Sequence, residues 1–423
     1  MANLSDLKKS ITNLLGLRKM IAAPKKNKLH EIIIFIFIAV NFSYILTYAF
    51  HNMEFLILNT VVTFTLVLIY QRSFPYIIQL PLSRWLLFYT VIHLIWILLP
   101  HSYATAQDVG NRFISIMYLF TLASLLYFDD ESLTIARKAI LLVTLISIFN
   151  HIYELFVPDA FYSLDAIKKI IGRSSGFYGN STGAGEAIIL GMILSYGMVP
   201  PPLKVPFLLF ALLGVIPTFS RAAIAAWFIV VFILVMTQAI KKKEAVTIGG
   251  IVFLLIAIAL PIFITFLDVF LGEEAANVLG RLDFFSSKHS VTDASAQSRV
   301  TIAKAGFEAF ANNPLLGGGL ALTYHWAHDI STHNIYLFHM AEFGIVGLFL
   351  YPLLLVALLL GARGEARKTG IAFVAFLFII GFTSHNVLDG FHTLLAIAVM
   401  ASWSFKSRTK TNPQHALFKA QAR

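Results

Sequence analysis

Cysteine is absent from this 423-residue chain, and so are several patterns that soluble enzymes use to bind nucleotides and metals. Without cysteine the chain has no disulfide, no thiolate metal ligand and no cysteine nucleophile. It also lacks an Asp-x-Asp pair for a metal-bound nucleotide sugar, a phosphate-binding loop ending in Gly-Lys-Ser/Thr, and a His-Glu-x-x-His motif. An enzyme built from this chain is therefore expected to work without a nucleotide, a metal or another cofactor.

Charge is scarce as well. Charged residues make up 13% of the chain and hydrophobic residues 58%, whereas an ordinary soluble domain has about 25% charged residues. The apolar runs predict an all-α polytopic membrane protein with about twelve transmembrane helices, because each crossing needs about 20 apolar residues. The predicted spans are 32–50, 55–70, 85–100, 113–128, 139–157, 185–199, 205–218, 222–240, 246–270, 335–360, 370–388 and 391–405.

The charges that are present predict an orientation. Most of the 32 lysine and arginine residues fall on one side of the membrane if both termini are cytoplasmic, as the positive-inside rule requires. The net charge of +10 then indicates contact with the anionic headgroups of membrane lipids, not with nucleic acid.

The spans and loops predict five segments. They are a cytoplasmic interfacial amphipathic helix within 1–30, transmembrane helices 1–9 over 31–270, one large periplasmic loop over 271–333, transmembrane helices 10–12 over 334–405, and a cytoplasmic tail over 406–423.

The loop 271–333 has one predicted helix of its own. Asp293 and Ser298 are residue types that cap helix N-termini, and the apolar residues after them recur at helical spacing. We therefore expect a short amphipathic helix over 299–312. Arg299 would lie in its first turn, where free backbone N–H groups and the helix dipole attract anions.

Three arginines fall in predicted outer loops, where lysine and arginine should be scarce. Arg221 lies in a very short turn between two apolar runs, Arg173 precedes a turn rich in glycine and asparagine, and Arg299 opens the loop helix. A guanidinium makes forked contacts with phosphate oxygens, so these arginines are candidate diphosphate-binding residues. Each also has a structural interpretation: Arg221 could reach the interface or pair with Glu186, and the other two could be solvated loop charges.

His333 is the candidate catalytic base. It lies where the loop ends and a long apolar run begins, and Ser331 or Thr332 is expected to cap the helix that follows. His333 would then occupy the first turn, where the dipole disfavours the imidazolium and keeps the imidazole neutral, as a general base requires. The structural alternative is an interfacial histidine satisfied by water. Asn334 and His385 are secondary candidates for the same pocket.

Two further features concern metals and buried charge. The spacing of His325, His328 and Asp329 is a weak signal for a metal site, and no metal is predicted. Glu342 lies inside the predicted span 335–360, where a carboxylate needs a partner. The structural interpretation is helix pairing through nearby glycines, with Glu342 hydrogen-bonded.

Four stretches of the chain resemble the O-antigen ligase and polymerase superfamily of bacterial membrane glycosyltransferases. They are Arg173-Ser174-Ser175-Gly176-Phe177-Tyr178-Gly179-Asn180, Thr218-Phe219-Ser220-Arg221, Arg299 followed by Asn313-Pro314-Leu315-Leu316-Gly317-Gly318-Gly319, and His333-Asn334 with Glu342-Phe343-Gly344-Ile345-Val346-Gly347. The resemblance implies an all-helical, metal-independent membrane glycosyltransferase. Its donor would be a glycan on undecaprenyl diphosphate at the periplasmic face, and in ligases its acceptor would be a lipid A-core sugar. Arg221 and Arg299 match the diphosphate-binding arginines of the family, and His333 matches the proposed base.

The resemblance leaves the reaction open. Polymerases of the same superfamily extend the glycan on its lipid carrier, and protein O-oligosaccharyltransferases transfer it to a protein. The long loop ending in His333-Asn334 and the twelve-span layout favour a ligase in the bacterial inner membrane. A secondary transporter or flippase is the alternative from another class. The lack of an internal repeat and the grouping of charges at one membrane face argue against it.

Overall fold

The computed structural model describes residues 28–45, 80–99, 103–128, 130–157, 160, 173–178, 180–254, 294–328 and 331–409. The predicted span 55–70, most of the segments 1–30 and 406–423, and the first third of the loop 271–333 lie outside the described residues. Every regular element in the described part is a helix, which confirms the all-helical prediction.

The helices that build the fold are α2 (Lys28–Ser43), α6 (Pro81–Ile97), α7 (Ala106–Phe128), α8 (Asp130–Phe156), α9 (Ser181–Ser195), α10 (Lys204–Val215), α11 (Arg221–Met236), α14 (Ala294–Asn312), α15 (Leu322–His325), α16 (Ile335–Phe343), α17 (Ile345–Leu359), α18 (Gly364–Ile380) and α19 (Phe391–Thr409). Short 3₁₀ turns join several of them, among them η2 (Gly176–Tyr178) and η5 (Ile216–Thr218).

Several described helices can cross a membrane by length and composition. Three stretches are long and apolar enough: Ala106–Tyr127, Glu131–Phe156 and Pro201–Thr218. Four further apolar helices are shorter: Glu31–Ser43, Pro81–Ile97, Arg221–Met236 and Ile345–Leu359. These helices support a membrane protein, while the count of twelve spans stays a prediction.

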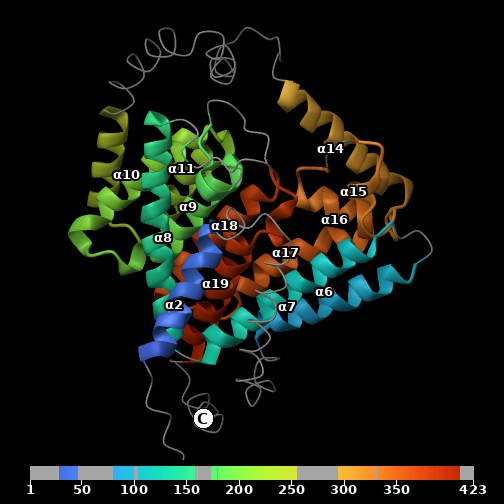
Figure 1. Cartoon of the computed structure of the whole chain (residues 1–423), viewed down its shortest axis with the longest axis horizontal. Coiled ribbons are helices and arrows are strands. Elements are labelled where there is room, and N and C mark those ends of the chain that lie inside the picture. Colours follow the sequence, from blue (N-terminus) through green and yellow to red (C-terminus); the bar gives the residue numbers. More distant parts are fainter. Residues whose placement is uncertain are drawn as a thin grey trace, which may run out of the picture.

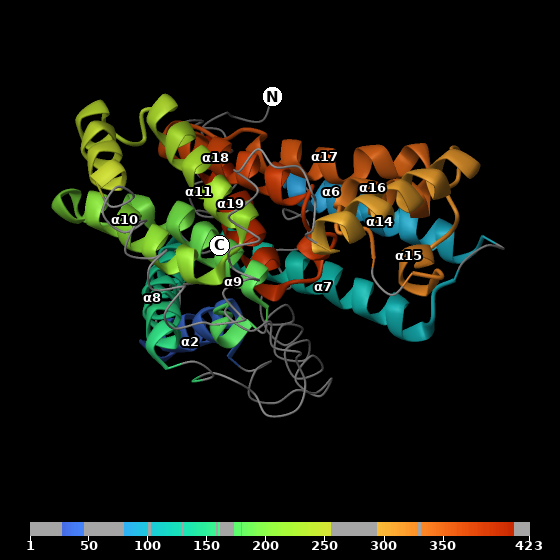
Figure 2. The ribbon, with the colours of Figure 1, turned by 90° about the horizontal axis from the view of Figure 1, so that it is seen from above.

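Helix α19 lies at the centre of the bundle. Its residues 394–400 are at most 1% exposed, and it packs against α2, α7, α8, α9, α17 and α18. A helix that is apolar on all sides is stable only where neighbours surround it. Figure 1 shows α8, α9, α10 and α11 on one side of α19, and α6, α7 and α14 to α17 on the other; Figure 2 shows the same division from above.

The helix directions place several distant segments at one end of this bundle. Helices α11 and α18 pack together, and Lys368 Nζ, near the start of α18, donates to Gln238 O just after the end of α11 at 3.4 Å. The two helices are therefore antiparallel, so the start of α11 lies level with the end of α18. Ile335 N donates to Gly381 O, just after the end of α18, at 2.9 Å. The start of α16 therefore lies at the same end of the bundle as the start of α11. We call this the arginine end, because Arg221 begins α11.

The predicted single span 335–360 is wrong in one respect, because it is broken at Gly344. The break separates α16, nine residues long, from α17. Gly344 has φ +60° and ψ −139°, a conformation that side-chain-bearing residues avoid. An α16 of nine residues is about 14 Å long and cannot cross a bilayer core of about 30 Å by itself.

The glycine-rich loop after α14 wraps around this break. Gly318 N donates to Ala341 O at 2.7 Å and Gly319 N donates to Glu342 O at 3.2 Å, so the loop satisfies carbonyls that the helix end leaves free. Ile345 N in turn donates to Pro314 O at 2.8 Å. The stretch from residue 314 to residue 319 therefore has a structural role as the cap of α16.

Gly344→Ala is expected to destabilise the protein. The added Cβ would lie 2.6 Å from Leu315 C and O, and the φ of +60° adds strain of about 1–3 kcal/mol. The matched control is Gly110→Ala on α7, where the new Cβ meets nothing within 4 Å. Thermal unfolding in detergent should show a lower midpoint for Gly344→Ala and an unchanged or higher midpoint for Gly110→Ala. Equal midpoints would contradict the break.

Candidate functional site

His333 lies just outside the start of α16. Asn334, not Ser331 or Thr332, is the N-cap, and its side chain accepts from Tyr336 N and Leu337 N at 2.9 and 3.0 Å. The prediction that His333 occupies the first helical turn is therefore wrong. His333 instead precedes the cap, with the left-handed φ of +49°. The asparagine of the His333-Asn334 pair is thus a helix cap, and the strained backbone turns the histidine out of the helix.

The surroundings of His333 favour its neutral form. Its side chain is half-buried, and its ring centroid lies 5.5 Å from that of His385, in an edge-on arrangement. Burial lowers the pKa of His333 from 6.5, and the positive charge of Arg299 lowers it further. A neutral imidazole at neutral pH can accept a proton. The structure therefore brings together three of the predicted site residues: His333, His385 and Arg299.

Arg299 reaches this place because α14 packs on α16. Ile302 and Gly306 form the buried side of α14, and a Cβ added at Gly306 would lie 2.9 Å from Thr332 Cγ2. Helix α14 begins at Ala294 and not at residue 299. Arg299 is therefore in its second turn, and the predicted contribution of a free helix N-terminus at this arginine is wrong.

Arg173 and Arg221 form a second group at the arginine end. Arg173 Nε donates to Thr218 O at 2.8 Å, and Ser174 N donates to Pro217 O at 2.9 Å. The segment that carries Arg173 therefore lies on the turn that leads into Arg221. Thr218 is followed by Phe219 at φ +45°, which turns the chain sharply into α11. Two cationic side chains from distant parts of the sequence are thus held at one short turn.

Two polar residues of α8 hold the Arg173 segment in place. Glu154 Oε2 accepts from Ser174 Oγ at 2.5 Å and from Ser175 N and Gly176 N at 3.2 and 3.1 Å. His151 Nδ1 is hydrogen-bonded to Ser174 Oγ. These contacts hold the backbone directly after Arg173 in one position. A solvated arginine in a loop would not need such support, so they favour a binding role for Arg173.

Arg221 is the first residue of α11, and its side chain is exposed. Ser220 caps the helix by accepting from Ala223 N at 3.3 Å. The suggested partner Glu186 is buried on α9, and its Oε1 has no hydrogen-bond partner in the described part of the chain. The pairing of Arg221 with Glu186 through that oxygen is therefore not seen.

A buried ion pair that the sequence interpretation missed lies beside the His333 group. Arg112 Nη2 lies 2.8 Å from both carboxylate oxygens of Glu342, and Arg112 Nη1 lies 3.0 Å from His93 Nε2. The expectation that Glu342 has a partner is confirmed. The predicted span 113–128 begins after Arg112, but α7 already begins at Ala106, so Arg112 is helical and only 8% exposed.

The aromatic residues Phe338 and Tyr324 connect Arg112 to the His333 group. The Arg112 guanidinium carbon lies 5.2 Å from the Phe338 ring centroid and 6.0 Å from that of Tyr324. Both rings also lie near His385, at 6.1 and 6.2 Å. Arg112 therefore belongs to the same polar and aromatic cluster as His333 and His385.

The suggested metal ligands have other contacts. His325 Nε2 lies 2.8 Å from Asp108 Oδ2, and the His328 ring packs edge-on against Trp326 at 4.9 Å. Asp329 lies outside the described residues. His325 thus contacts α7 through Asp108, and His328 contacts the nearby ring of Trp326.

One stretch of the chain matches a known protein family. Residues 206–351 match the family model described as O-Antigen ligase. The matched stretch contains Arg221, Arg299 and His333, and it reaches into α17. The match supports membership of the chain in the O-antigen ligase superfamily, and with it glycosyltransferase activity of the ligase and polymerase type. Among curated proteins no match to the chain was found.

The pKa of His333 provides a prediction on pH. Unfolding restores the ordinary value of 6.5, whereas the folded value is lower. Stability contributed by the neutral ring is therefore present above pH 6.5 and is lost as pH falls through the folded pKa. Arg299→Gln removes the charge that depresses the pKa of His333, so the pKa should rise while remaining below 6.5.

Proton NMR titration of the imidazole Cε1–H, assigned with His333→Gln, measures this shift. Lys304→Gln, also on the exposed side of α14, is the matched control and should leave the pKa of His333 nearer its wild-type value. A His333 pKa at or above 6.5 in the wild type would contradict the described surroundings.

Proposed function

We propose that this protein is an O-antigen ligase that transfers a polysaccharide from undecaprenyl diphosphate to a lipid A-core sugar hydroxyl. The reaction takes place at the periplasmic face of the bacterial inner membrane, and both termini are cytoplasmic. The observation that carries the proposal is the placement of His333 and Arg221 at one end of the bundle, with Arg299 beside the histidine and Arg173 beside the other arginine. Both His333 and Arg221 lie in the segment that matches the ligase family.

The arginines bind the donor diphosphate. Arg221 and Arg173 lie together at the start of α11, level with the start of α16, where Arg299 and His333 lie. Guanidinium groups make bidentate contacts with phosphate oxygens, and a pair of them can span a diphosphate. Their charge also stabilises the negative charge that grows on the diphosphate as the sugar leaves. This is the electrostatic role that a divalent ion has in other transferases.

His333 accepts the proton of the acceptor hydroxyl. The hydroxyl oxygen attacks the anomeric carbon of the donor sugar, and a new glycosidic C–O bond forms. The bond from that carbon to the diphosphate oxygen breaks, its electron pair stays on the diphosphate, and the hydroxyl proton goes to the imidazole of His333. A single displacement of this kind inverts the anomeric centre. A positioned general base contributes about 10²–10⁴ in rate.

The acceptor decides between the reactions of the superfamily. A polymerase would join the donor glycan to a second lipid-linked glycan, and an O-oligosaccharyltransferase would join it to a protein. A transport function is disfavoured because Arg173, Arg221 and Arg299 lie at one end of the bundle and not at its middle, where transporters bind their substrates.

Purified protein mixed with undecaprenyl-diphosphate glycan and core glycolipid should form polymer-bearing lipopolysaccharide. His333→Ala should lower the rate by about 10²–10⁴, because no base then accepts the proton. His328→Ala, an exposed histidine of the same loop, is the matched control and should retain most of the rate. Near-normal turnover by His333→Ala would remove this residue from the mechanism.

The arginines are tested in the same assay. Arg221→Ala and Arg299→Ala should raise the KM for the donor or lower kcat, because each removes a cation that binds diphosphate. Lys242→Ala, in the exposed run after α11 at the opposite end, should behave as wild type. If all three variants are equally active, no diphosphate is bound at the arginine end.

A further inference from the structure

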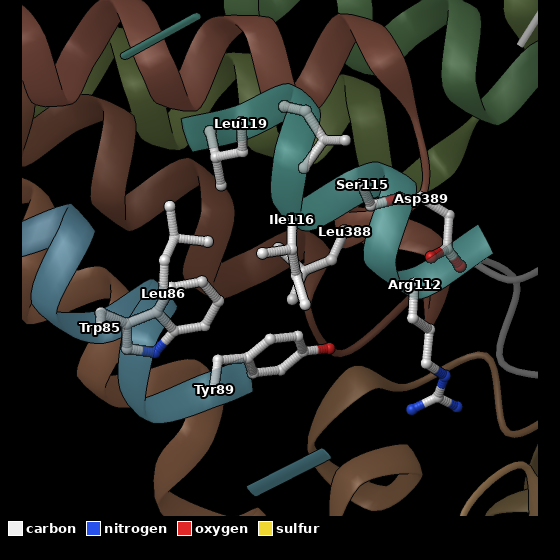
Figure 3. A pocket seen from close by; sticks show the side chains of 10 residues that line it. Trp85, Leu86, Tyr89, Arg112, Ser115, Ile116, Leu119, Leu388 and Asp389 are labelled. Atoms are coloured by element: carbon white, nitrogen blue, oxygen red, sulfur yellow. The ribbon is translucent and has the colours of Figure 1, made fainter. Parts of the chain in front are cut away.

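A small pocket opens between α6, α7 and the start of α19 (Figure 3). Its apolar side includes Trp85, Leu86 and Ile116. It holds about 20 Å³, which is room for a group the size of one water molecule. Nothing in the donor chemistry described above uses it.

Polar groups from three elements line this pocket. The Tyr89 side chain is only 7% exposed, and its hydroxyl points into the space between α6 and α7 (Figure 3). Within the ranges that the structure describes, this hydroxyl has no hydrogen-bond partner. Ser115 adds a second hydroxyl to the lining, and Asp389 adds a carboxylate. A tyrosine hydroxyl that no described protein group engages is free to hydrogen-bond a group that enters the pocket.

The charges around the pocket select a neutral ligand. Arg112 lines it, but both carboxylate oxygens of Glu342 lie 2.8 Å from Arg112 Nη2 and offset its charge. Asp389 adds negative charge. A phosphate or diphosphate would therefore be repelled here. Groups that both donate and accept hydrogen bonds, such as sugar hydroxyls, fit Tyr89, Ser115 and Asp389 together.

The pocket is joined to His333 by two side chains. Tyr324 donates from its hydroxyl to Asp389 Oδ2 at 3.2 Å, and its ring centroid lies 6.2 Å from that of His385. The His385 ring in turn lies 5.5 Å from that of His333. These steps keep the pocket within the reach of a short oligosaccharide from the candidate base.

We propose that this pocket is an acceptor subsite, which takes one hydroxyl or hydroxymethyl group of the acceptor glycan. The pocket is too small for a whole ring, so the sugar rests at its rim, against Tyr324, and the next part of the glycan reaches His333. The acceptor then comes from the side of α6 and α7, and the donor diphosphate from the side of α9 and α11. This inference rests on the proposed function, because it assigns a site to the acceptor of that reaction.

Tyr89→Phe tests the subsite, because it removes the hydroxyl and keeps the ring. We expect the KM for core glycolipid to rise about 3- to 10-fold, the usual effect of one lost hydrogen bond. The KM for undecaprenyl-diphosphate glycan should not change. Tyr153→Phe, half-exposed on α8, is the matched control and should leave both values at the wild-type level. Ser115→Leu, which fills the pocket, should raise the acceptor KM further.

A binding measurement without donor separates this inference from the proposed function. Core glycolipid is titrated into each purified protein, and the change in tryptophan fluorescence is followed, since Trp85 lines the pocket. Weaker binding by Tyr89→Phe, in the proportion seen for KM, supports the subsite. Equal binding by wild type and variant, or a rise in donor KM alone, overturns the subsite and leaves the proposed function standing. A wild type that transfers no glycan to core glycolipid overturns the proposed function itself.

Discussion

The ion pair between Arg112 and Glu342 is the interaction on which the site depends most. It joins α7 to the last turn of α16, immediately before the break at Gly344, and both side chains are almost completely buried. Removing one partner of such a pair leaves an uncompensated buried charge and costs about 3–5 kcal/mol. Because α16 is only nine residues long, this anchor and the glycine-rich loop determine where its N-terminus lies. That N-terminus presents His333.

The arginine end then combines two kinds of surroundings. Arg221 is exposed and Arg173 is partly buried beside it, and two guanidinium groups at one short turn suit an anionic diphosphate. Around Arg112 the charge is offset by a carboxylate, and the lining is aromatic and hydroxyl-bearing, which suits a neutral sugar. His333 lies between a cationic neighbour, Arg299, and the aromatic cluster of His385. A group-transfer reaction needs this division, because the donor and the acceptor must meet at the base from different sides.

The sequence predicted the helical class well, because apolar composition determines it, and it identified the residues now found at the arginine end. It did not predict the break at Gly344, because 335–360 is one continuous apolar run and the signal lies in a glycine-rich loop distant in sequence. The predicted last span, 391–405, is α19, and its central place in the bundle was not predicted. Arg112 was missed because α7 starts earlier than its apolar run. The sequence did contain one signal for this ion pair: Glu342 lies within a predicted span, where a carboxylate needs a partner.

The position at which a donor analogue attaches tests the central claim most directly. A photoreactive undecaprenyl-diphosphate glycan, bound to the purified protein and irradiated, would label the residues that surround the diphosphate. Mass spectrometry of the labelled peptides locates the site. The account predicts label in 173–178 and 216–224, with further label in the stretches that contain Arg299 and His333. Label concentrated at the opposite end, in 238–245 and 363–368, would contradict it.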